Sequence, residues 1–412
     1  MQAILQGASR KVKTPMSTLA SSPARPASQD AVLAFAWDSS EFTATEALQS
    51  TGLTRSTTIE ATDALVARGL LRELPNARLA GDYRKGRPAR RFVLREDAAV
   101  VVGVDAGHEH VSVTVADLRG TRIADADTRL VLDRDDGPAR AAIVAETIDR
   151  ALAAADVTRT DVLAVCAGVP APVDRTGRSP RHPTRFWERM NPDLADVLSW
   201  APIVRIENDA SLAAIAEGSV GAAKGCQDYI ALLAGSRLGA GVVVDGRLLR
   251  GSHGGVGEMV AFDHVDGVHG AEGLGHRVAA WASELAQSGE ATAGFRDVAP
   301  ESLDARTVLA MAAQGDADAL RIVDRVGLAL ARIVSVLGSM FDPERVVVSG
   351  AIADGVAEVV AAARRSLPTD LDLPAPELVA STLGGEVVVT GAVAAAVASA
   401  RERVLDVWGA AG

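Results

Sequence analysis

The stretch Gly52-Leu-Thr-Arg-Ser-Thr-Thr-Ile59 decides how the first part of this chain folds. Its glycine permits the positive φ of a tight turn, and Thr54 can cap a helix that begins directly after it. We expect the buried face of that helix to hold Ile59, Ala61, Leu65 and Val66. Upstream, Thr43 and Glu46 have the spacing of a capping box, which predicts a second helix over Thr43–Ser50. Two helices joined by a glycine turn at this spacing predict a helix-turn-helix.

The flanking sequence completes a small winged domain. Ala31–Trp37 is typical of a further helix, and Leu70–Leu74 can pair with Arg90–Leu94 as antiparallel strands. The residues between these strands are basic and rich in Gly and Pro, as expected of a wing. We therefore predict a winged helix over residues 30–97. Residues 1–29 contain no acidic residue and too little apolar surface to order themselves, so we expect a disordered tail.

The third helix and the wing carry the side chains expected to contact DNA. The third helix can lie in the major groove, where Arg pairs with guanine and hydroxyl groups reach bases or phosphates. The predicted contacts are Arg55, Ser56, Thr57 and Thr58 on the helix, and Lys85, Arg87 and Arg90 on the wing. We expect Arg87 to enter a minor groove or to hold a phosphate. The alternative is that the Ser and Thr residues only cap the helix.

Charge is distributed unevenly along the chain. Of 412 residues, the first 97 hold 14 Lys and Arg against 10 Asp and Glu, whereas the remainder holds 28 against 43. A mildly basic head on an acidic body is compatible with nucleic-acid binding by the head alone, despite the formal net charge of −11.

The composition bounds the class of protein. At this length we expect two or three domains, and the balance of 48% hydrophobic and 23% charged residues is typical of a soluble globular protein. Apolar runs fall short of a membrane-spanning helix, so we predict no membrane segment. Cys166 and Cys226 are the only two cysteines. They can form neither a disulfide framework nor a cysteine metal cluster, which favours a reducing, cytoplasmic location.

Beyond Ala98 the pattern alternates between strands and helices, which predicts an α/β domain. We expect strands at Val100–Val104, Val111–Asp117, Thr121–Val131, Val162–Val169, Ile203–Ile206, Ile230–Leu233, Gly241–Val244, Arg345–Ser349 and Glu386–Thr390. We expect helices at Ala139–Ala155, Ala210–Ala222, 274–288, 303–313, 316–340 and 355–366, with a closing helix after the last strand.

Three segments of the head together resemble the winged helix of the ROK family, which comprises repressors, open reading frames and sugar kinases. They are Gly52-Leu-Thr-Arg-Ser-Thr-Thr-Ile59, Ala64-Leu-Val-Ala-Arg-Gly-Leu-Leu71 and Lys85-Gly-Arg-Pro-Ala89. The resemblance continues to the C-terminus. It implies that residues 98–412 adopt the two-lobed, actin-like (ribonuclease H-type) fold of the family's sugar kinases.

Two glycine-rich segments resemble the turns that hold ATP phosphates in the family's kinases. The first is Val102-Gly-Val-Asp-Ala-Gly107, where the turn continues as His108-Glu109-His110 and Glu109 would repel an anion. The two histidines could suggest a metal, although exposed polar residues in a hairpin turn are the commoner explanation. The second is Leu233–Gly246, in which Arg237 stands where a small residue is usual. The resemblance therefore implies degenerate phosphate turns and no bound cofactor.

Other segments resemble the family's sugar site. In Ile206-Glu-Asn-Asp-Ala210, Asp209 stands at the position of the general base, which we interpret as vestigial, and Asn208 at a position that binds sugar hydroxyls. Alternatively, Asp209 is the N-cap of the helix Ala210–Ala222, and both roles could hold together. Glu258 matches a sugar-binding Glu, and His276 replaces another.

The family's three-cysteine zinc loop lies between these two ligand positions. Here the cysteine positions fall on Gly267, His269 and Leu274, so we expect no metal. Trp187 could stack on a sugar or could belong to the core.

Together these features predict a transcriptional regulator, a repressor of carbohydrate-related genes, that binds double-stranded DNA as a homodimer or homotetramer. The kinase-like body is expected to be inactive and to sense a sugar or sugar derivative. An active ATP-dependent sugar kinase with an accessory head is the main alternative. A scaffold that binds a partner protein is a third.

Overall fold

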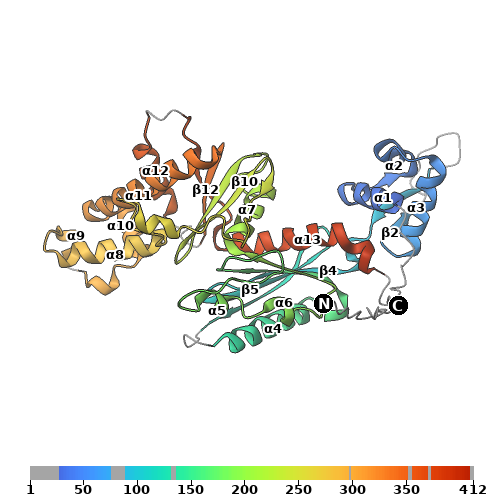
Figure 1. The fold of residues 1–412 in the computed structure, drawn as a ribbon, viewed down its shortest axis with the longest axis horizontal. Helices are drawn as coiled ribbons and strands as arrows, with labels where there is room; N and C mark the ends of the chain where they lie inside the picture. Colours follow the sequence, from blue (N-terminus) through green and yellow to red (C-terminus); the bar gives the residue numbers. More distant parts are fainter. Residues whose placement is uncertain are drawn as a thin grey trace, which may run out of the picture. The chain divides into compact units, whose positions relative to one another are not determined.

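The structure is a computed structural model. It describes residues 27–75, 89–130, 136–296, 298–350, 355–369 and 373–408. The chain divides into two compact units, Met1–Leu94 and Arg95–Gly412 (Figure 1). Among the described residues, none of the helices has the length and apolar character needed to cross a membrane.

In the described residues of the first unit, three helices combine with a small antiparallel sheet. Its elements are α1 (Ala27–Asp38), β1 (Phe42–Thr43), α2 (Ala44–Thr51), α3 (Arg55–Ala67), β2 (Leu71–Leu74) and β3 (Arg91–Leu94), with strand order β1-β3-β2. Thr43 and Glu46 form the predicted capping box, and Thr54 caps α3 by accepting from the backbone N–H of Thr57. Gly52 has φ 69°, which confirms the predicted glycine turn.

Three expectations for this unit need correction or fall outside the described residues. The buried face of α3 is formed by Thr58, Ala61, Thr62 and Leu65, whereas Ile59 is 37% exposed. The expected placement of Ile59 was therefore wrong. Helix α1 begins at Ala27, inside the stretch expected to be disordered. The rest of that tail and residues 76–88, which include Lys85 and Arg87, lie outside the described residues.

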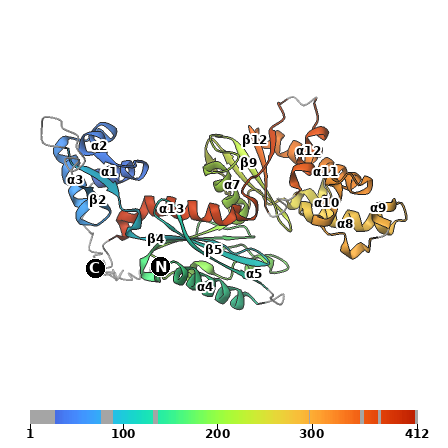
Figure 2. The ribbon, with the colours of Figure 1, turned by 180° about the vertical axis from the view of Figure 1, so that it is seen from behind.

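The first lobe of the second unit is a five-stranded sheet between two helical layers. Its strands are β4 (Val100–Asp105), β5 (His110–Asp117), β6 (Arg122–Arg129), β7 (Val162–Val169) and β8 (Ile203–Asn208), in the order β6-β5-β4-β7-β8. Helix α4 (Gly137–Ala154) covers one face and α13 (Val387–Val407) the other (Figures 1 and 2). Every residue of β4 and β7 is buried, as expected of central strands covered on both faces. The short helices α5 (Phe186–Met190) and α6 (Leu194–Val197) precede β8.

The second lobe repeats the same sheet topology. Its strands are β9 (Tyr229–Ala234), β10 (Leu238–Val244), β11 (Arg247–Leu248), β12 (Arg345–Ser349) and β13 (Glu377–Ala380), in the order β11-β10-β9-β12-β13. Its helices are α8 (Leu274–Gln287), α9 (Ala293–Arg296), α10 (Ala305–Ala313), α11 (Ala317–Phe341) and α12 (Val356–Ser366). Helix α7 (Asp209–Ser219) packs against β9, β10 and α13. Each lobe thus has three antiparallel strands followed by two parallel ones, and the predicted two-lobed α/β fold is confirmed.

The strand expected at Glu386–Thr390 was wrong. These residues lie in the 3-10 turn and first turns that begin α13, and the last strand is β13 instead. A run of three valines favours a strand, but here Val387, Val388 and Val389 are all buried within the helix. At Gly391 an added Cβ would lie 1.9 Å from the carbonyl oxygen of Leu212 in α7. Burial in this close helix packing overrides the local strand preference.

Candidate functional sites

The exposed face of α3 is the candidate nucleic-acid interface. Arg55 and Ser56 are exposed at its N-terminus, where the Thr54 hydroxyl lies 3.1 Å from that of Ser56 and 2.8 Å from that of Thr57. Thr58 is 1% exposed, and its hydroxyl donates to the Thr54 carbonyl at 2.9 Å. The expectation that Thr58 reaches DNA is therefore corrected, because this side chain faces the core.

Arg90 joins this helix to the hairpin. Its guanidinium donates to Asp63 of α3 and Glu73 of β2, both at 2.8 Å, and lies 4.9 Å from the centre of the Phe92 ring. The hydrogen bond to Glu73, followed by that to Asp63, raises the pKa of Arg90. In this geometry Arg90 fixes the position of α3 relative to the strands.

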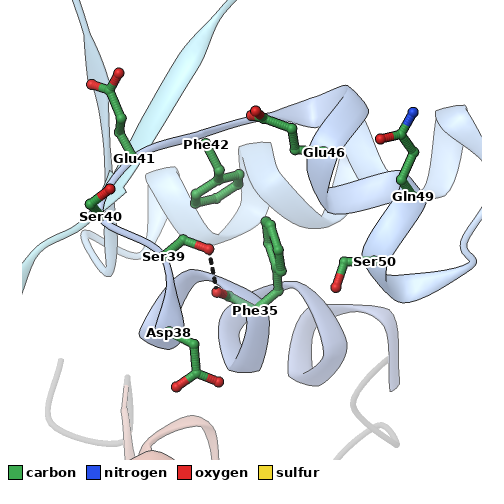
Figure 3. Close-up of a pocket in the computed structure, with 9 residues that line it drawn as sticks. All are labelled: Phe35, Asp38, Ser39, Ser40, Glu41, Phe42, Glu46, Gln49 and Ser50. Carbon is green, nitrogen blue, oxygen red and sulfur yellow. Dashed lines mark hydrogen bonds between the residues drawn. The ribbon is translucent and has the colours of Figure 1, made fainter.

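A broad hollow on the first unit is acidic (Figure 3). It measures about 610 Å³ and lies between α1 and α2, with Asp38, Glu41 and Glu46 among its lining residues. Phe35 and Phe42 meet edge to face at 5.4 Å, and the Ser39 hydroxyl donates to the Phe35 carbonyl at 2.8 Å. Phosphate groups would be repelled here. The electrostatics therefore favour α3 over this hollow as the DNA-facing surface.

The first phosphate-like turn is held by side chains from two directions. His110 Nε2 lies 3.0 Å from the 4%-exposed Asp105, and this hydrogen bond raises the pKa of His110. A Cβ added to Gly107 would lie 2.6 Å from the His110 ring, so the imidazole rests directly against the turn. The other side chain is Arg140 of α4, which is 1% exposed.

Arg140 donates to three main-chain carbonyls: those of Ala106, of Gly107 at 2.6 Å and of Met190 at 3.2 Å. Burial lowers the pKa of Arg140 to about 10, so the group stays charged at neutral pH. Arg140 was not predicted from the sequence as a residue of the site. The available signal was its position on the same helical face as Val144 and Ile148, which are both buried.

Asn208 and Asp209 lie where β8 meets α7. Asn208 is the N-cap, since its Oδ1 accepts from the Ser211 N–H at 3.0 Å, and its Nδ2 donates to the Ala171 carbonyl at 3.2 Å. The alternative that Asp209 is the N-cap was therefore wrong. Burial raises the pKa of Asp209 to about 8, and the nearby charges of Asp105 and Glu258 add to this effect. At neutral pH the Asp209 carboxyl is mainly protonated, and so donates a hydrogen bond more readily than it accepts a proton.

Glu258 and His276 have different surroundings. The backbone of Glu258 forms a bridge with Gly239 at the second phosphate-like turn, and burial raises the pKa of Glu258. His276 is more exposed, with its Nε2 3.8 Å from Glu272, which also lies 3.8 Å from Arg237. The charges of Asp105 and Glu258 both act on Asp209, whereas His276 lies beside Glu272. Arg237 connects the two groups, because it lies 3.8 Å from Glu272 and its charge also acts on Glu258.

Within the described part of the chain, no group of three His, Cys, Asp or Glu residues is placed to hold a metal ion. His108 packs 5.8 Å from the ring of Phe186, and His269 packs 5.3 Å from the ring of Trp281. Trp187 is partly buried against the first lobe's core and lies 4.6 Å from the ring of His182. Its geometry favours the core interpretation over an open stacking face.

A second hollow, of about 480 Å³, borders β8. The 3%-exposed Glu207 accepts from Arg205 at 2.6 Å and from Arg250 at 2.8 Å, and both arginines line the hollow. Arg205 and Glu207 belong to β8, whereas Arg250 follows β11. This ion network, which sequence reasoning missed, therefore ties one lobe's sheet to the other's.

Comparison with known proteins matches residues 101–398 to the sequence model of the ROK family. A glucokinase of Thermotoga maritima is 31% identical over 243 residues, which cover 55% of this chain and 76% of the relative. A bifunctional enzyme NanE/NanK of Brucella suis is 31% identical over 219 residues, covering 50% of this chain. The matched region spans only 39% of that relative's length.

Regulators also appear among the similar proteins. A xylose repressor of Caldicellulosiruptor bescii is 25% identical over 213 residues, covering 50% of this chain and 51% of the relative. The crystal structure of a ROK family transcriptional regulator, a homologue of the Escherichia coli MLC protein, superposes with a TM-score of 0.71. That superposition covers 93% of this chain and 99% of the other at 18% identity, so it bears on the fold alone.

Proposed function

Because this chain belongs to the ROK family, we propose that it is a DNA-binding transcriptional regulator, acting as a repressor of carbohydrate-related genes. The observation that carries the proposal is a capped helix, α3, whose N-terminus exposes Arg55 and Ser56 and which Arg90 holds against a β-hairpin. To recognise bases in a major groove, a helix must be held in a fixed position with its N-terminal side chains exposed. Similarity to a xylose repressor supports the same class.

We assign the base and phosphate contacts to Arg55, Ser56 and Thr57 on α3 and to Lys85 and Arg87 on the wing. Arg90 acts through the position of α3, because its guanidinium is already paired with two carboxylates. One such unit offers few contacts, so the chain binds two-fold operators as a homodimer or homotetramer. This role and the two free cysteines support a cytoplasmic location.

The test is selection of bound duplexes from a random pool with the full chain, followed by titration with salt. We expect an enriched sequence whose affinity falls steeply as salt rises. Arg55→Ala should cost about 1–3 kcal/mol on that sequence and relax preference at one position, whereas Arg87→Ala should weaken all duplexes evenly. A pool that shows no enrichment at moderate salt would contradict the proposal.

An active sugar kinase is the second candidate, favoured by the glucokinase relative and by Asp209 and Glu258. Three features of the structure argue against kinase activity. The His110 ring rests on Gly107, Arg140 binds the carbonyls of the first turn, and burial raises the pKa of Asp209 to about 8. We propose that phosphoryl transfer is lost. Sugar-dependent release of ADP above that of Asp209→Ala would decide for the kinase.

We propose that the second unit still binds a sugar or a similar polyol as its effector, at Asp209 and Glu258. A protonated Asp209 and a half-buried Glu258 offer a donor and an acceptor to neutral hydroxyls. A ligand that favours one arrangement of the lobes would change DNA affinity. Calorimetry against a panel of sugars and sugar phosphates tests this. Binding abolished by Glu258→Ala supports the proposal, and no heat across the panel contradicts it.

A further inference from the structure

The guanidinium group of Arg277 lies within the loop that runs from Gly267 to helix α8. Arg277 itself belongs to the first turn of α8, is 2% exposed, and donates hydrogen bonds through three of its nitrogens. Nε donates to the Glu272 carbonyl at 2.8 Å, Nη2 to the Gly270 carbonyl at 2.6 Å, and Nη1 to the Val268 carbonyl. One side chain therefore binds three alternate carbonyls of a five-residue segment.

This loop is where the resemblance to the family places zinc, and the residues present do not fit a metal. None of Gly267, His269 and Leu274 supplies a thiolate. Gly267 has φ 73°, and a Cβ there would lie 1.7 Å from Arg332, whose Nη1 donates to the Gly267 carbonyl at 2.9 Å. Leu274 is 1% exposed in the lobe's core. Gly267 and Leu274 thus present no metal-binding side chain, and the positive φ of Gly267 disfavours any side chain there.

The loop in turn supports the second phosphate-like turn, residues 235–239. The Leu238 N–H donates to the Ala271 carbonyl at 2.9 Å, and the Gly273 N–H donates to the Ser236 carbonyl at 3.0 Å. A Cβ at Gly273 would lie 1.9 Å from the Gly235 carbonyl oxygen, so the two backbones touch. Whatever fixes segment 268–273 therefore also fixes turn 235–239.

We propose that the guanidinium of Arg277 replaces the metal as the cross-link of this loop, and that Arg277 is thereby a positioning residue for turn 235–239. The planar fork suits the task, because its donors diverge in one plane toward separate acceptors, as a lysine ammonium cannot. Turn 235–239 carries Gly239, which pairs with Glu258. The cross-link therefore reaches a side chain assigned to effector binding, although its own existence does not depend on that function.

The experiment is amide hydrogen exchange of the full chain, read at segments 268–273 and 235–239. We expect Arg277→Met, which keeps the volume but not the donors, to speed exchange at least tenfold in both segments. Arg277→Lys should give an intermediate increase, since one ammonium satisfies fewer carbonyls. Arg306→Met, at an exposed arginine of the same lobe, is the matched control and should exchange as the original chain does.

Elemental analysis and zinc titration complete the test. We expect no stoichiometric zinc and no change in exchange when zinc or a chelator is added. Zinc bound one to one, or unchanged exchange in Arg277→Met, would overturn the proposal. If Arg277→Met does not fold, Arg277→Lys decides: exchange equal to that of the original chain in both segments would equally overturn it. A missing effector would leave these readouts intact, so failure of the proposed function is distinguishable.

Discussion

Each lobe of the second unit contains a buried arginine that binds main-chain carbonyls at or next to a phosphate-like turn, but the two arginines differ in how far along the chain their partners lie. Arg140 joins Ala106 and Gly107 to Met190, so its partners lie 33 to 50 residues away in the chain. Arg277 binds only carbonyls 5 to 9 residues before it. The first cross-link thus closes long chain segments, and the second orders a single loop. We therefore expect the first to contribute to global stability and the second to local order.

The largest expected effect tests this difference directly. Arg140→Met leaves three buried carbonyls without a donor, and should reduce the free energy of unfolding by about 3 kcal/mol or more. Arg277→Met should cost clearly less, because its loop can open to water without unfolding the lobe. Urea unfolding followed by circular dichroism measures both, with Arg306→Met as control. Equal losses for the two variants would contradict the distinction between long-range and local cross-links.

The same difference explains what could be predicted from the sequence. The caps at Thr43 and Thr54 were predictable because each depends on residues three apart. Asp209 and Glu258 were proposed as site residues from family motifs. Arg140 and Arg277 were not found, because their acceptors are main-chain carbonyls that no residue type marks. Thr58 was expected to be exposed and is buried, whereas Ile59 was expected to be buried and is exposed. A helical pattern taken from one turn predicts the buried face only to within one residue.

A medium effect concerns the carboxyl group of Asp209, whose pKa is influenced by Asp105 of the first lobe and Glu258 of the second. Burial raises the pKa of Asp209 to about 8 in the folded chain, above its ordinary value near 4. The folded state therefore binds a proton that the unfolded state releases between these values. Its contribution to stability is fully present below about pH 4 and is lost as pH rises through about 8.

Asp209→Asn should remove this dependence. We expect the variant to match the original chain near pH 4 and to be increasingly more stable than it as pH rises toward 8 to 9. Thermal unfolding across this range measures the difference. Asp263→Asn, in the second lobe's 3-10 helix (Val260–His264), is the matched control. Parallel pH profiles for Asp209→Asn and the original chain would show that the lobes do not hold this carboxyl protonated.

The smallest expected effect concerns His110, a titratable side chain that contacts the first phosphate-like turn. We expect no equivalent contribution from a histidine at the second phosphate-like turn. The hydrogen bond to Asp105 raises the pKa of His110, so the pair stabilises the fold below the ordinary histidine value near 6.5. This contribution is lost as pH rises through the raised value. Because the His110 side chain is half exposed, we expect it to stay below about 1 kcal/mol. The free energy of unfolding of His110→Ala should therefore differ from that of the original chain at pH 5 to 6 and converge with it well above pH 7.

His276→Ala in the second lobe is the control, because 3.8 Å separates His276 from Glu272 and no hydrogen bond is lost. An equal, pH-dependent loss in both variants would remove the asymmetry between the two turns.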